Sequence, residues 1–188
     1  MAISCTRRDE ARESLDYYAT PPRAVKELLK LEAFSRDIWE PCCGGGHISK
    51  ELIAQGYHVF STDIADHGYG IPGIDFLAER DLVDTDIITN PPYTQAQAFV
   101  EHALKMVTRG HKVAMFLRLV FLETQARKEL FQKFPPIRVH VSSVRLGCAK
   151  NGEFKCRPDG ELYYPSSVAY AWFIWEAGYK GPTIIDWF

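Results

Sequence analysis

The sequence lacks several features that define large classes of proteins. No apolar run approaches the roughly 20 residues of a membrane-spanning helix, and the N-terminal stretch has no apolar core of the kind found in signal peptides. We see no internal repeat and no low-complexity linker in the 188 residues. These absences predict a cytoplasmic protein without a membrane partner, folded as a single domain over 1–188.

Cysteines are few and poorly placed for disulfides or for metal binding. The five cysteines are an odd number, and two of them, Cys42 and Cys43, are adjacent and could close only a strained ring. Neither Cys148 nor Cys156 has a second cysteine or a histidine pair at the spacing of a zinc site. We therefore expect reduced thiols and no metal.

An excess of positive charge is also missing. The formal net charge is -2 at pH 7, with 46% hydrophobic and 24% charged residues. This is the composition of a globular protein, and its charge does not favour coating nucleic acid by bulk attraction. Any binding to nucleic acid must therefore come from a local site.

Strand-like and helix-like segments alternate along the chain. This order predicts an α/β fold, a doubly wound, Rossmann-like sheet that is mostly parallel, with ligands at the carboxyl ends of the strands. The last two strands, 137–146 and 166–178, suit a terminal antiparallel hairpin, and the aromatic residues of the second suit the core. The other expected strands are 36–40, 57–63, 74–77, 85–89 and 111–121, and the expected helices are 20–34 (with Thr20 as N-cap), 47–56, 94–110 and 123–134.

Three successive strand ends carry glycine or acidic residues. Glu40 comes just before "PCCGGG", and no Lys-Ser or Lys-Thr follows, so this is not a nucleotide phosphate loop. Glu40 suits a cationic group, and Asp63 suits the hydroxyls of a ribose. Asp75 and Phe76 suit a purine. Ordinary turns with solvated acids are the alternative, but three such ends together favour a site for a nucleoside with a positively charged appendage.

Residues 90–93 read "NPPY" and interrupt the chain directly after a buried strand. An aromatic amine is a weak nucleophile because its lone pair is delocalised into the ring. The Asn90 side-chain oxygen and the Pro91 carbonyl could accept its two N–H bonds, and Pro92 fixes the turn. Tyr93 offers a face for a planar base. The motif therefore indicates chemistry on a planar amine.

Five motifs occur together in the order typical of one enzyme family. They are "DYYATPP" (16–22), "EPCCGGGHIS" (40–49), "TDI" (62–64), "DF" (75–76) and "NPPY" (90–93). In this the chain resembles amino-group DNA methyltransferases of the N6-adenine type, in a compact phage- or prophage-type form. The resemblance implies S-adenosyl-L-methionine as cofactor and DNA as partner. RNA and protein-glutamine methyltransferases also carry NPPY, so both remain alternatives, as does a non-catalytic nucleic-acid-binding module.

The resemblance also implies roles for individual residues. Asn90, Pro91, Pro92 and Tyr93 match the catalytic motif. Residues matching the cofactor site are Tyr17, Tyr18, Thr20, Pro21, Glu40, Cys42, Gly44, Gly46, Asp63, Ile64, Asp75 and Phe76. Many relatives have a small residue or Phe before a glycine-rich loop, whereas Cys42 and Cys43 precede three glycines here. This departure preserves a backbone role for the loop but leaves the Cys42 side chain without an expected one.

DNA contacts are expected in a basic and aromatic stretch near the C-terminus. The region at about 145–166 has the composition of a small DNA-contacting insertion, with a solvated hairpin as the alternative. Arg118 follows a strand at the same edge as the other motifs, and the N-terminal "TRRDEAR" is a second candidate. The candidate DNA-binding residues are Arg118, Arg145, Lys150, Lys155 and Arg157.

Overall fold

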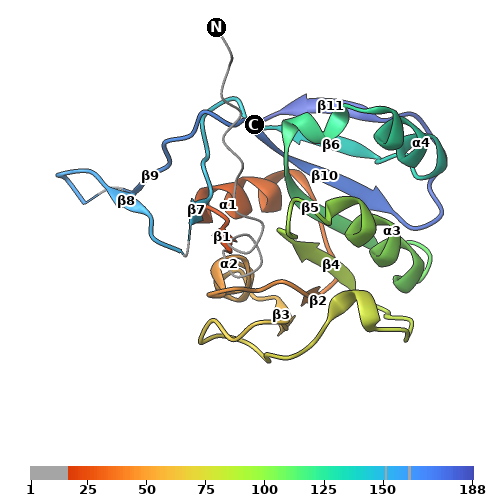
Figure 1. The fold of residues 1–188 in the computed structure, drawn as a ribbon, viewed down its shortest axis with the longest axis horizontal. Helices are drawn as coiled ribbons and strands as arrows, with labels where there is room; N and C mark the ends of the chain where they lie inside the picture. The colour runs from red at the N-terminus through yellow and green to blue at the C-terminus, as the bar shows by residue number, and fades with distance from the viewer. Residues whose placement is uncertain (1–16, 151, 161) are drawn as a thin grey trace, which may run out of the picture.

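The chain folds as a three-layered α/β structure with a central sheet and helices on both faces (Figure 1). The computed structural model describes residues 17–150, 152–160 and 162–188, and the "TRRDEAR" candidate lies outside these ranges. No described helix is long and apolar enough to cross a membrane.

The central sheet has seven strands in the order β11-β6-β10-β5-β4-β2-β3. Neighbouring strands are parallel, except that β10 is antiparallel to both β5 and β6. The expected mostly parallel sheet with a closing antiparallel pair is thus confirmed. The strands are β2 (Asp37–Glu40), β3 (His58–Ser61), β4 (Asp86–Thr89), β5 (Lys112–Arg118), β6 (Arg138–Val141), β10 (Tyr170–Glu176) and β11 (Ile184–Trp187).

Two helices cover each face of the sheet. α1 (Pro22–Leu31) and α2 (His47–Ala54) pack on one face, where Leu28 and Leu52 are fully buried. α3 (Ala96–Met106) and α4 (Gln125–Lys133) pack on the other. β10 contributes to both cores because its side chains alternate, with Trp172 on the α1 side and Phe173 on the α3 side. The expected core role of these aromatic residues is confirmed.

Two expectations about element ends are wrong. Residues 74–77 do not form a strand, because the Asp75 side chain accepts a hydrogen bond from Leu77 N and starts the short 3-10 helix η2 (Phe76–Ala78). Thr20 does not cap α1, which begins at Pro22 with Pro21 at the N-cap position and no side-chain cap. The hydroxyl of Thr20 is instead buried without a partner among the described residues.

Several short elements had no sequence signal. A second 3-10 helix, η3 (Leu119–Leu122), follows β5. β1 (Tyr18–Ala19) pairs antiparallel with β7 (Ala149–Lys150), which joins the N-terminal motif to the 145–166 region. β8 (Lys155–Cys156) and β9 (Leu162–Tyr163) form a two-stranded hairpin that projects from the body of the molecule (Figure 1). We call residues 147–166, from the root to the end of this hairpin, the arm.

Candidate active site

The carboxyl ends of β2, β3 and β4 lie side by side at one edge of the sheet. All three strands are parallel, so the residues that follow them meet there. The Gly44 N–H donates to Asp63 Oδ2 at 2.8 Å, which joins the glycine loop after β2 to the acid after β3. Asp63 Oδ1 accepts from Ala65 N at 3.0 Å. The structure therefore brings two of the expected cofactor motifs into direct contact.

The glycine loop has a backbone that only glycine adopts readily. Gly44 has φ 49° and Gly46 has φ 76°, both in the left-handed region. A Cβ on Gly44 would lie 2.7 Å from the Tyr17 ring, and a Cβ on Gly46 would lie 2.4 Å from the Tyr69 ring. Two aromatic rings thus lie directly against the loop backbone, which has no room for side chains.

Glu40 is buried at the end of β2 and is bound to the first turn of α2. Its Oε2 accepts from Ser49 N at 2.8 Å and from the Ser49 hydroxyl, which in turn lies 2.6 Å from Ser61 Oγ. Burial raises the pKa of Glu40 to about 8, and the bonds from Ser49 offset only part of this effect. The described ion pairs include neither Glu40 nor Asp63. Two carboxyl groups beside the loop, those of Glu40 and Asp63, therefore have no basic partner in the described part of the chain.

The two adjacent thiols lie under this loop and are free, as expected from the sequence. Burial raises the pKa of Cys42 well above its ordinary value, and it raises the pKa of Cys43 to about 12. Cys42 packs against the core on the α3 side of the sheet. Both side chains therefore act as small apolar groups that support the loop from below.

The N-terminal motif reaches across to NPPY. The carbonyl of Tyr18 accepts a 2.7 Å hydrogen bond from Asn90 Nδ2, and the Tyr18 and Tyr93 rings are 6.1 Å apart. Thr20 and Pro21 follow Tyr18 closely in the sequence, just before α1, and both are buried. Segments separated by 72 positions in the chain thus meet at the carboxyl end of β4.

Asn90 holds its amide in a defined orientation. Nδ2 donates to Tyr18 O and, at 3.7 Å, to Cys148 Sγ. Oδ1 is buried and has no hydrogen-bond partner in the described structure. No described backbone N–H donates to the Pro91 carbonyl, whereas that of Pro92 accepts from Gln95 N at 2.9 Å. Two acceptor oxygens of the motif are therefore available.

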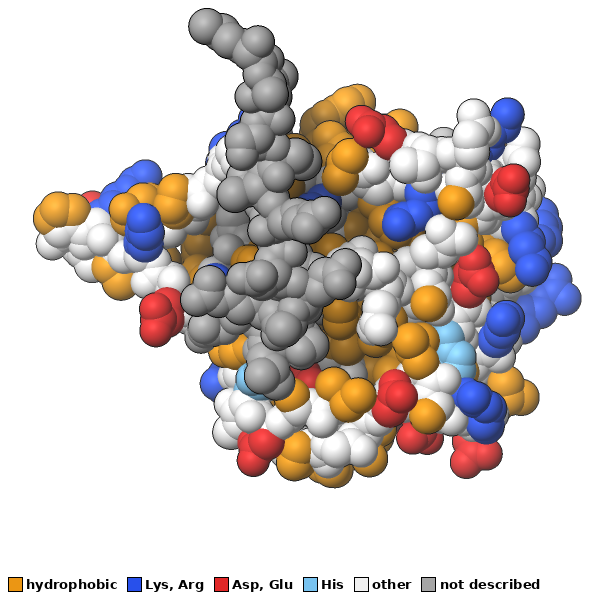
Figure 2. All heavy atoms as spheres, viewed as in Figure 1, with side chains coloured by type: hydrophobic (Ala, Val, Ile, Leu, Met, Phe, Trp, Pro, Cys, Tyr) orange, Lys and Arg blue, Asp and Glu red, His pale blue; other side chains and the backbone are white. Residues whose placement is uncertain are grey.

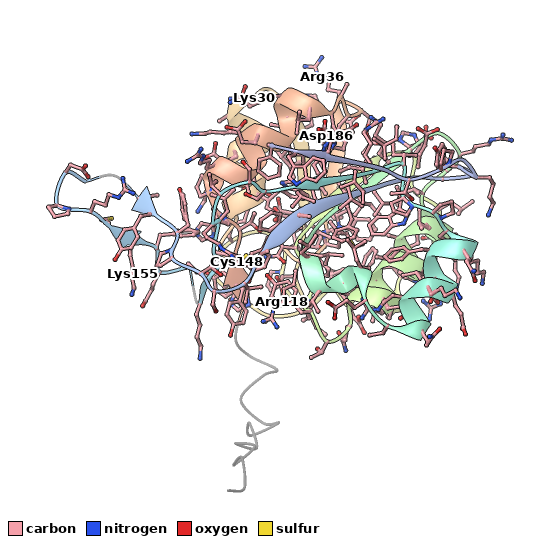
Figure 3. The ribbon with its side chains drawn as sticks, turned by 90° about the horizontal axis from the view of Figure 1, so that it is seen from above. Lys30, Arg36, Arg118, Cys148, Lys155 and Asp186 are labelled. Carbon is pink, nitrogen blue, oxygen red and sulfur yellow. The ribbon has the colours of Figure 1, made fainter. Side chains whose placement is uncertain are left out.

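Tyr93 is surrounded by groups from four other segments. Its hydroxyl donates to Cys148 Sγ at 3.3 Å, and the Arg118 guanidinium lies over its ring at 4.5 Å. The ring of Tyr170 lies 6.1 Å away. Arg118 Nε is buried without a partner among the described residues. Figure 3 shows Arg118 and Cys148 close together at this end of the sheet.

The remaining cofactor candidates lie farther along the same edge. Ile64 is exposed, directly after Asp63, and Asp75 is exposed at the start of η2. Phe76 is only 2% exposed, because its ring packs against Trp39 and Phe99. Its side chain lies in the core, so it offers a ligand no open ring face.

The arm lies next to the glycine loop and also carries most of the expected DNA contacts. A Cβ on Gly152 would lie 2.5 Å from the Tyr17 hydroxyl, and the Phe154 and His47 rings are 5.4 Å apart. Farther out, Lys155 and Arg157 are exposed, and Figure 2 shows basic side chains along this projection. Arg145 and Lys150 are exposed near its root. Arg118 lies apart from these four, over Tyr93.

Two residues at this site were missed from the sequence. Cys148 and Tyr170 each contact Tyr93, but neither lies in a motif or at a predicted strand end. Cys148 precedes β7, a two-residue strand that the sequence does not signal. Tyr170 lies at the start of β10, opposite Arg118 on β5, so the antiparallel register gives its position.

The fold is similar to those of solved methyltransferases, although no protein-family model and no curated protein match the sequence. A protein described as a class I S-adenosylmethionine-dependent methyltransferase, from Listeria monocytogenes, matches 90% of this chain with a TM-score of 0.64 and 13% identity. The methyltransferase subunit of a type I restriction-modification system from Streptococcus thermophilus matches 91% of this chain, with a TM-score of 0.63 and 13% identity.

A third structure has nearly the length of this chain. It is described as an RNA methyltransferase from Pyrococcus horikoshii, with a TM-score of 0.59, 13% identity and 91% coverage of both chains. This chain spans 65% of the Listeria protein and 47% of the Streptococcus subunit. Together, the seven-stranded sheet and these likenesses show that the chain has the fold of class I S-adenosylmethionine-dependent methyltransferases.

Proposed function

We propose that the protein transfers a methyl group from S-adenosylmethionine to the N6 amine of adenine in DNA. The observation that carries this proposal is the state of Asn90. Its amide nitrogen is held by Tyr18 O and Cys148 Sγ, while its oxygen is buried and has no partner among the residues that the structure describes. A buried oxygen without a donor is unfavourable unless a ligand supplies one. The two hydrogens of an amine are suitable donors.

The residues present fit S-adenosylmethionine as the cofactor. The loop places tightly turned backbone next to two carboxyl groups, Glu40 and Asp63, which have no basic partner among the described residues. A nucleoside that carries positive charge complements such a site electrostatically. Asp63 would hold the ribose hydroxyls, and the orphan hydroxyl of Thr20 is available to a polar group of the cofactor. When bound, the cofactor supplies an electrophilic methyl group.

Asn90 and Pro91 prepare the amine to react. With Asn90 Oδ1 and the Pro91 carbonyl each accepting one N–H, the nitrogen becomes pyramidal and its lone pair turns away from the ring system. The nitrogen takes the methyl group as the methyl–sulfur bond breaks to leave a neutral thioether. It loses its extra proton to water only after the N–C bond has formed, so a histidine base is not required. The fixed turn at Pro91 and Pro92 keeps both acceptors in place before the substrate arrives.

Tyr93 offers the surface for the target base. The guanidinium of Arg118 lies over its ring at 4.5 Å, so one face of the ring already carries a cationic group. Adenine in a duplex must leave the base stack to reach Tyr93, and stacking on an aromatic side chain stabilises the extruded base. Arg118 would then lie beside the base or give up its place over the ring.

The arm favours DNA, but RNA is a second candidate. Four basic residues and three aromatic ones on the arm and its root suit contacts with phosphates and bases. The similarity in fold and length to a protein described as an RNA methyltransferase makes RNA the second candidate. Both substrates present the same amine, so the site chemistry does not separate them.

The substrate is tested by offering methyl-labelled cofactor together with duplex DNA, RNA of the same sequence and a mixed protein sample. We expect the label in DNA, recovered as N6-methyl-deoxyadenosine after digestion to nucleosides. Label in RNA or protein alone would contradict DNA as the substrate. Label in another DNA base would contradict adenine as the target.

A further inference from the structure

The root of the arm lies directly against the catalytic motif. Cys148 is the residue that makes this contact, between Gly147 and β7. Its place is fixed on both sides, because Gly147 N donates to Tyr164 O at 3.2 Å and β7 pairs with β1. A Cβ on Gly147 would lie 2.7 Å from the Pro165 carbonyl, so the two strands of the arm pack tightly at its root.

The thiol of Cys148 contacts two of the four NPPY residues. Asn90 Nδ2 donates to its sulfur at 3.7 Å, and the Tyr93 hydroxyl donates to it at 3.3 Å. The ring of Tyr170 lies 6.1 Å from that of Tyr93, next to the same thiol contact. One side chain from the arm therefore connects the amide of Asn90 to the ring of Tyr93.

These contacts determine which of its two orientations the Asn90 side-chain amide adopts. An amide can turn over, exchanging its oxygen and its nitrogen, and its surroundings decide which arrangement is stable. Tyr18 O can only accept, and it fixes one N–H of Asn90. Cys148 Sγ accepts the other, so Oδ1 has to point away from both. The same sulfur restrains the hydroxyl end of Tyr93 and thereby the plane of its ring.

We propose that Cys148 is a positioning residue for methyl transfer, which holds the Asn90 amide and the Tyr93 ring in the orientation that an amine substrate requires. This inference rests on the proposed function for its catalytic meaning. It also makes catalysis dependent on the arm, because the arm must lie on β1 for Cys148 to reach the motif. The thiol of Cys148 is thus the contact between the arm, where the substrate would bind, and the catalytic residues Asn90 and Tyr93.

The thiol acts in its neutral form. Burial raises the pKa of Cys148 to about 11, despite hydrogen bonds from Tyr93, Tyr170 and Asn90 that lower it. A neutral thiol is a weak acceptor, so its loss should reduce catalysis without abolishing it. Serine has a hydroxyl at the same position and can accept the same two hydrogen bonds.

The test compares Cys148→Ala and Cys148→Ser with the matched control Cys156→Ser, an exposed thiol in β8 of the same arm. We expect Cys148→Ala to lower kcat by roughly tenfold, the worth of one lost hydrogen bond, with the KM for the cofactor unchanged. Cys148→Ser should recover most of that loss, and Cys156→Ser should match the wild type. Equal kcat in all four proteins would overturn the inference.

A second readout does not depend on activity. The side-chain NH2 signals of Asn90, assigned by their disappearance in Asn90→Asp, should shift in Cys148→Ala and return toward the wild-type position in Cys148→Ser. Unmoved signals would overturn the inference even in an active enzyme. A wild-type protein that methylates no adenine but shows these shifts would contradict the proposed function alone, and the positioning contact would stand.

Discussion

At the scale of single residues, the site is defined by polar atoms that lack partners. Asn90 Oδ1 and Thr20 Oγ1 are buried without hydrogen bonds among the described residues. Glu40 and Asp63 accept hydrogen bonds from Ser49 and Gly44 but have no basic partner there. Folded proteins satisfy most buried polar groups, so the two unpartnered oxygens at this edge of the sheet point to ligands that complete them.

Asn90 gives the most direct prediction at this scale. Asn90→Ala removes an acceptor that serves only the reacting amine, so we expect transfer to fall by at least about 100-fold. Cofactor affinity should change little, because Asn90 contacts Tyr18 and Cys148 rather than the glycine loop. Steady-state kinetics and calorimetric titration of the cofactor measure the two effects separately. Retained activity would contradict the acceptor role.

Glu40 predicts a particular dependence of stability on pH. Its pKa is about 8 in the folded state, against about 4.5 when unperturbed. Between these values the folded protein binds a proton that the unfolded chain has lost, so stability falls as pH rises, by up to about 1.4 kcal/mol per pH unit. Glu40→Gln should remove this slope. Urea unfolding at several pH values compares the two proteins, and identical slopes would contradict a raised pKa.

At the scale of elements, the proposed function assigns cofactor binding to the glycine loop and DNA binding to the arm. The loop is shaped by backbone and lies under two aromatic rings, whereas the arm carries exposed basic side chains. The loop was predictable because a glycine cluster between a strand and a helix has few other uses. The basic and aromatic composition of the arm could also be read from the sequence, but the pairing of its strand β7 with β1 could not be predicted. Two-residue strands have no periodicity, and their partners are set by the tertiary fold.

Gly44 tests the role of the loop against a matched glycine. Gly44→Ala and Gly68→Ala both place a side chain at positive φ, which costs about 1–2 kcal/mol in each. Only Gly44→Ala also drives a Cβ into the Tyr17 ring, since nothing lies within 4 Å of the corresponding Cβ on Gly68. We expect some thermal destabilisation in both, larger for Gly44→Ala because of the clash, but at least about tenfold weaker cofactor binding for Gly44→Ala alone. Equal affinities in calorimetric titration would exclude the loop from the cofactor site.

Lys155 and Arg157 test the arm as a DNA contact. Replacing both with glutamine should weaken duplex binding and lower the slope of log K against log salt by about 1.8, if each neutralises one phosphate. Arg36→Gln is the control, an exposed basic residue on the body of the molecule, well apart from the arm (Figure 3). Cofactor affinity should be unchanged in all of them. A slope that matches the wild type would remove these residues from the interface.

At the scale of the whole molecule, a buried ionic cluster joins three elements away from the site. Glu32, just after α1, pairs with Lys112 of β5 and with Arg138 and His140 of β6. Burial alone would raise the pKa of Glu32, but hydrogen bonds from His140, Arg138 and Lys112 outweigh it and hold the pKa well below its ordinary value. The cluster therefore fixes α1, and with it the N-terminal motif, against the sheet.

This cluster predicts sensitivity to acid. A lowered folded-state pKa gives stability that is present above the unfolded value near 4.5 and is lost as pH falls below it. Glu32→Gln leaves three basic groups without their shared anion, and we expect it to lower unfolding stability at neutral pH by about 3 kcal/mol. It should also flatten the fall in stability at low pH. Chemical unfolding across pH measures both effects, and an unchanged profile would contradict the cluster's contribution.

The overall fold followed from the alternation of elements, and the errors have local causes. Asp75 starts a 3-10 helix rather than ending a strand, because its side chain bonds to Leu77 N. That placed Phe76 in the core, where the sequence had suggested a face for a purine. β11 was missed because its four residues are exposed and lack alternation. The contacts of Cys148 with Asn90 and Tyr93 could not be predicted from the sequence, because they depend on which residues the fold brings next to this single thiol.

The central claim is that Asn90 serves methyl transfer to the N6 amine of adenine in DNA. Its most direct test is nucleoside mass spectrometry of genomic DNA from cells that express the wild type or Asn90→Ala at equal levels. We predict N6-methyl-deoxyadenosine above the level of control cells for the wild type only. Background levels with both proteins, although the purified wild type binds the cofactor, would contradict DNA adenine as the substrate. Equal methylation by both would contradict the role of Asn90.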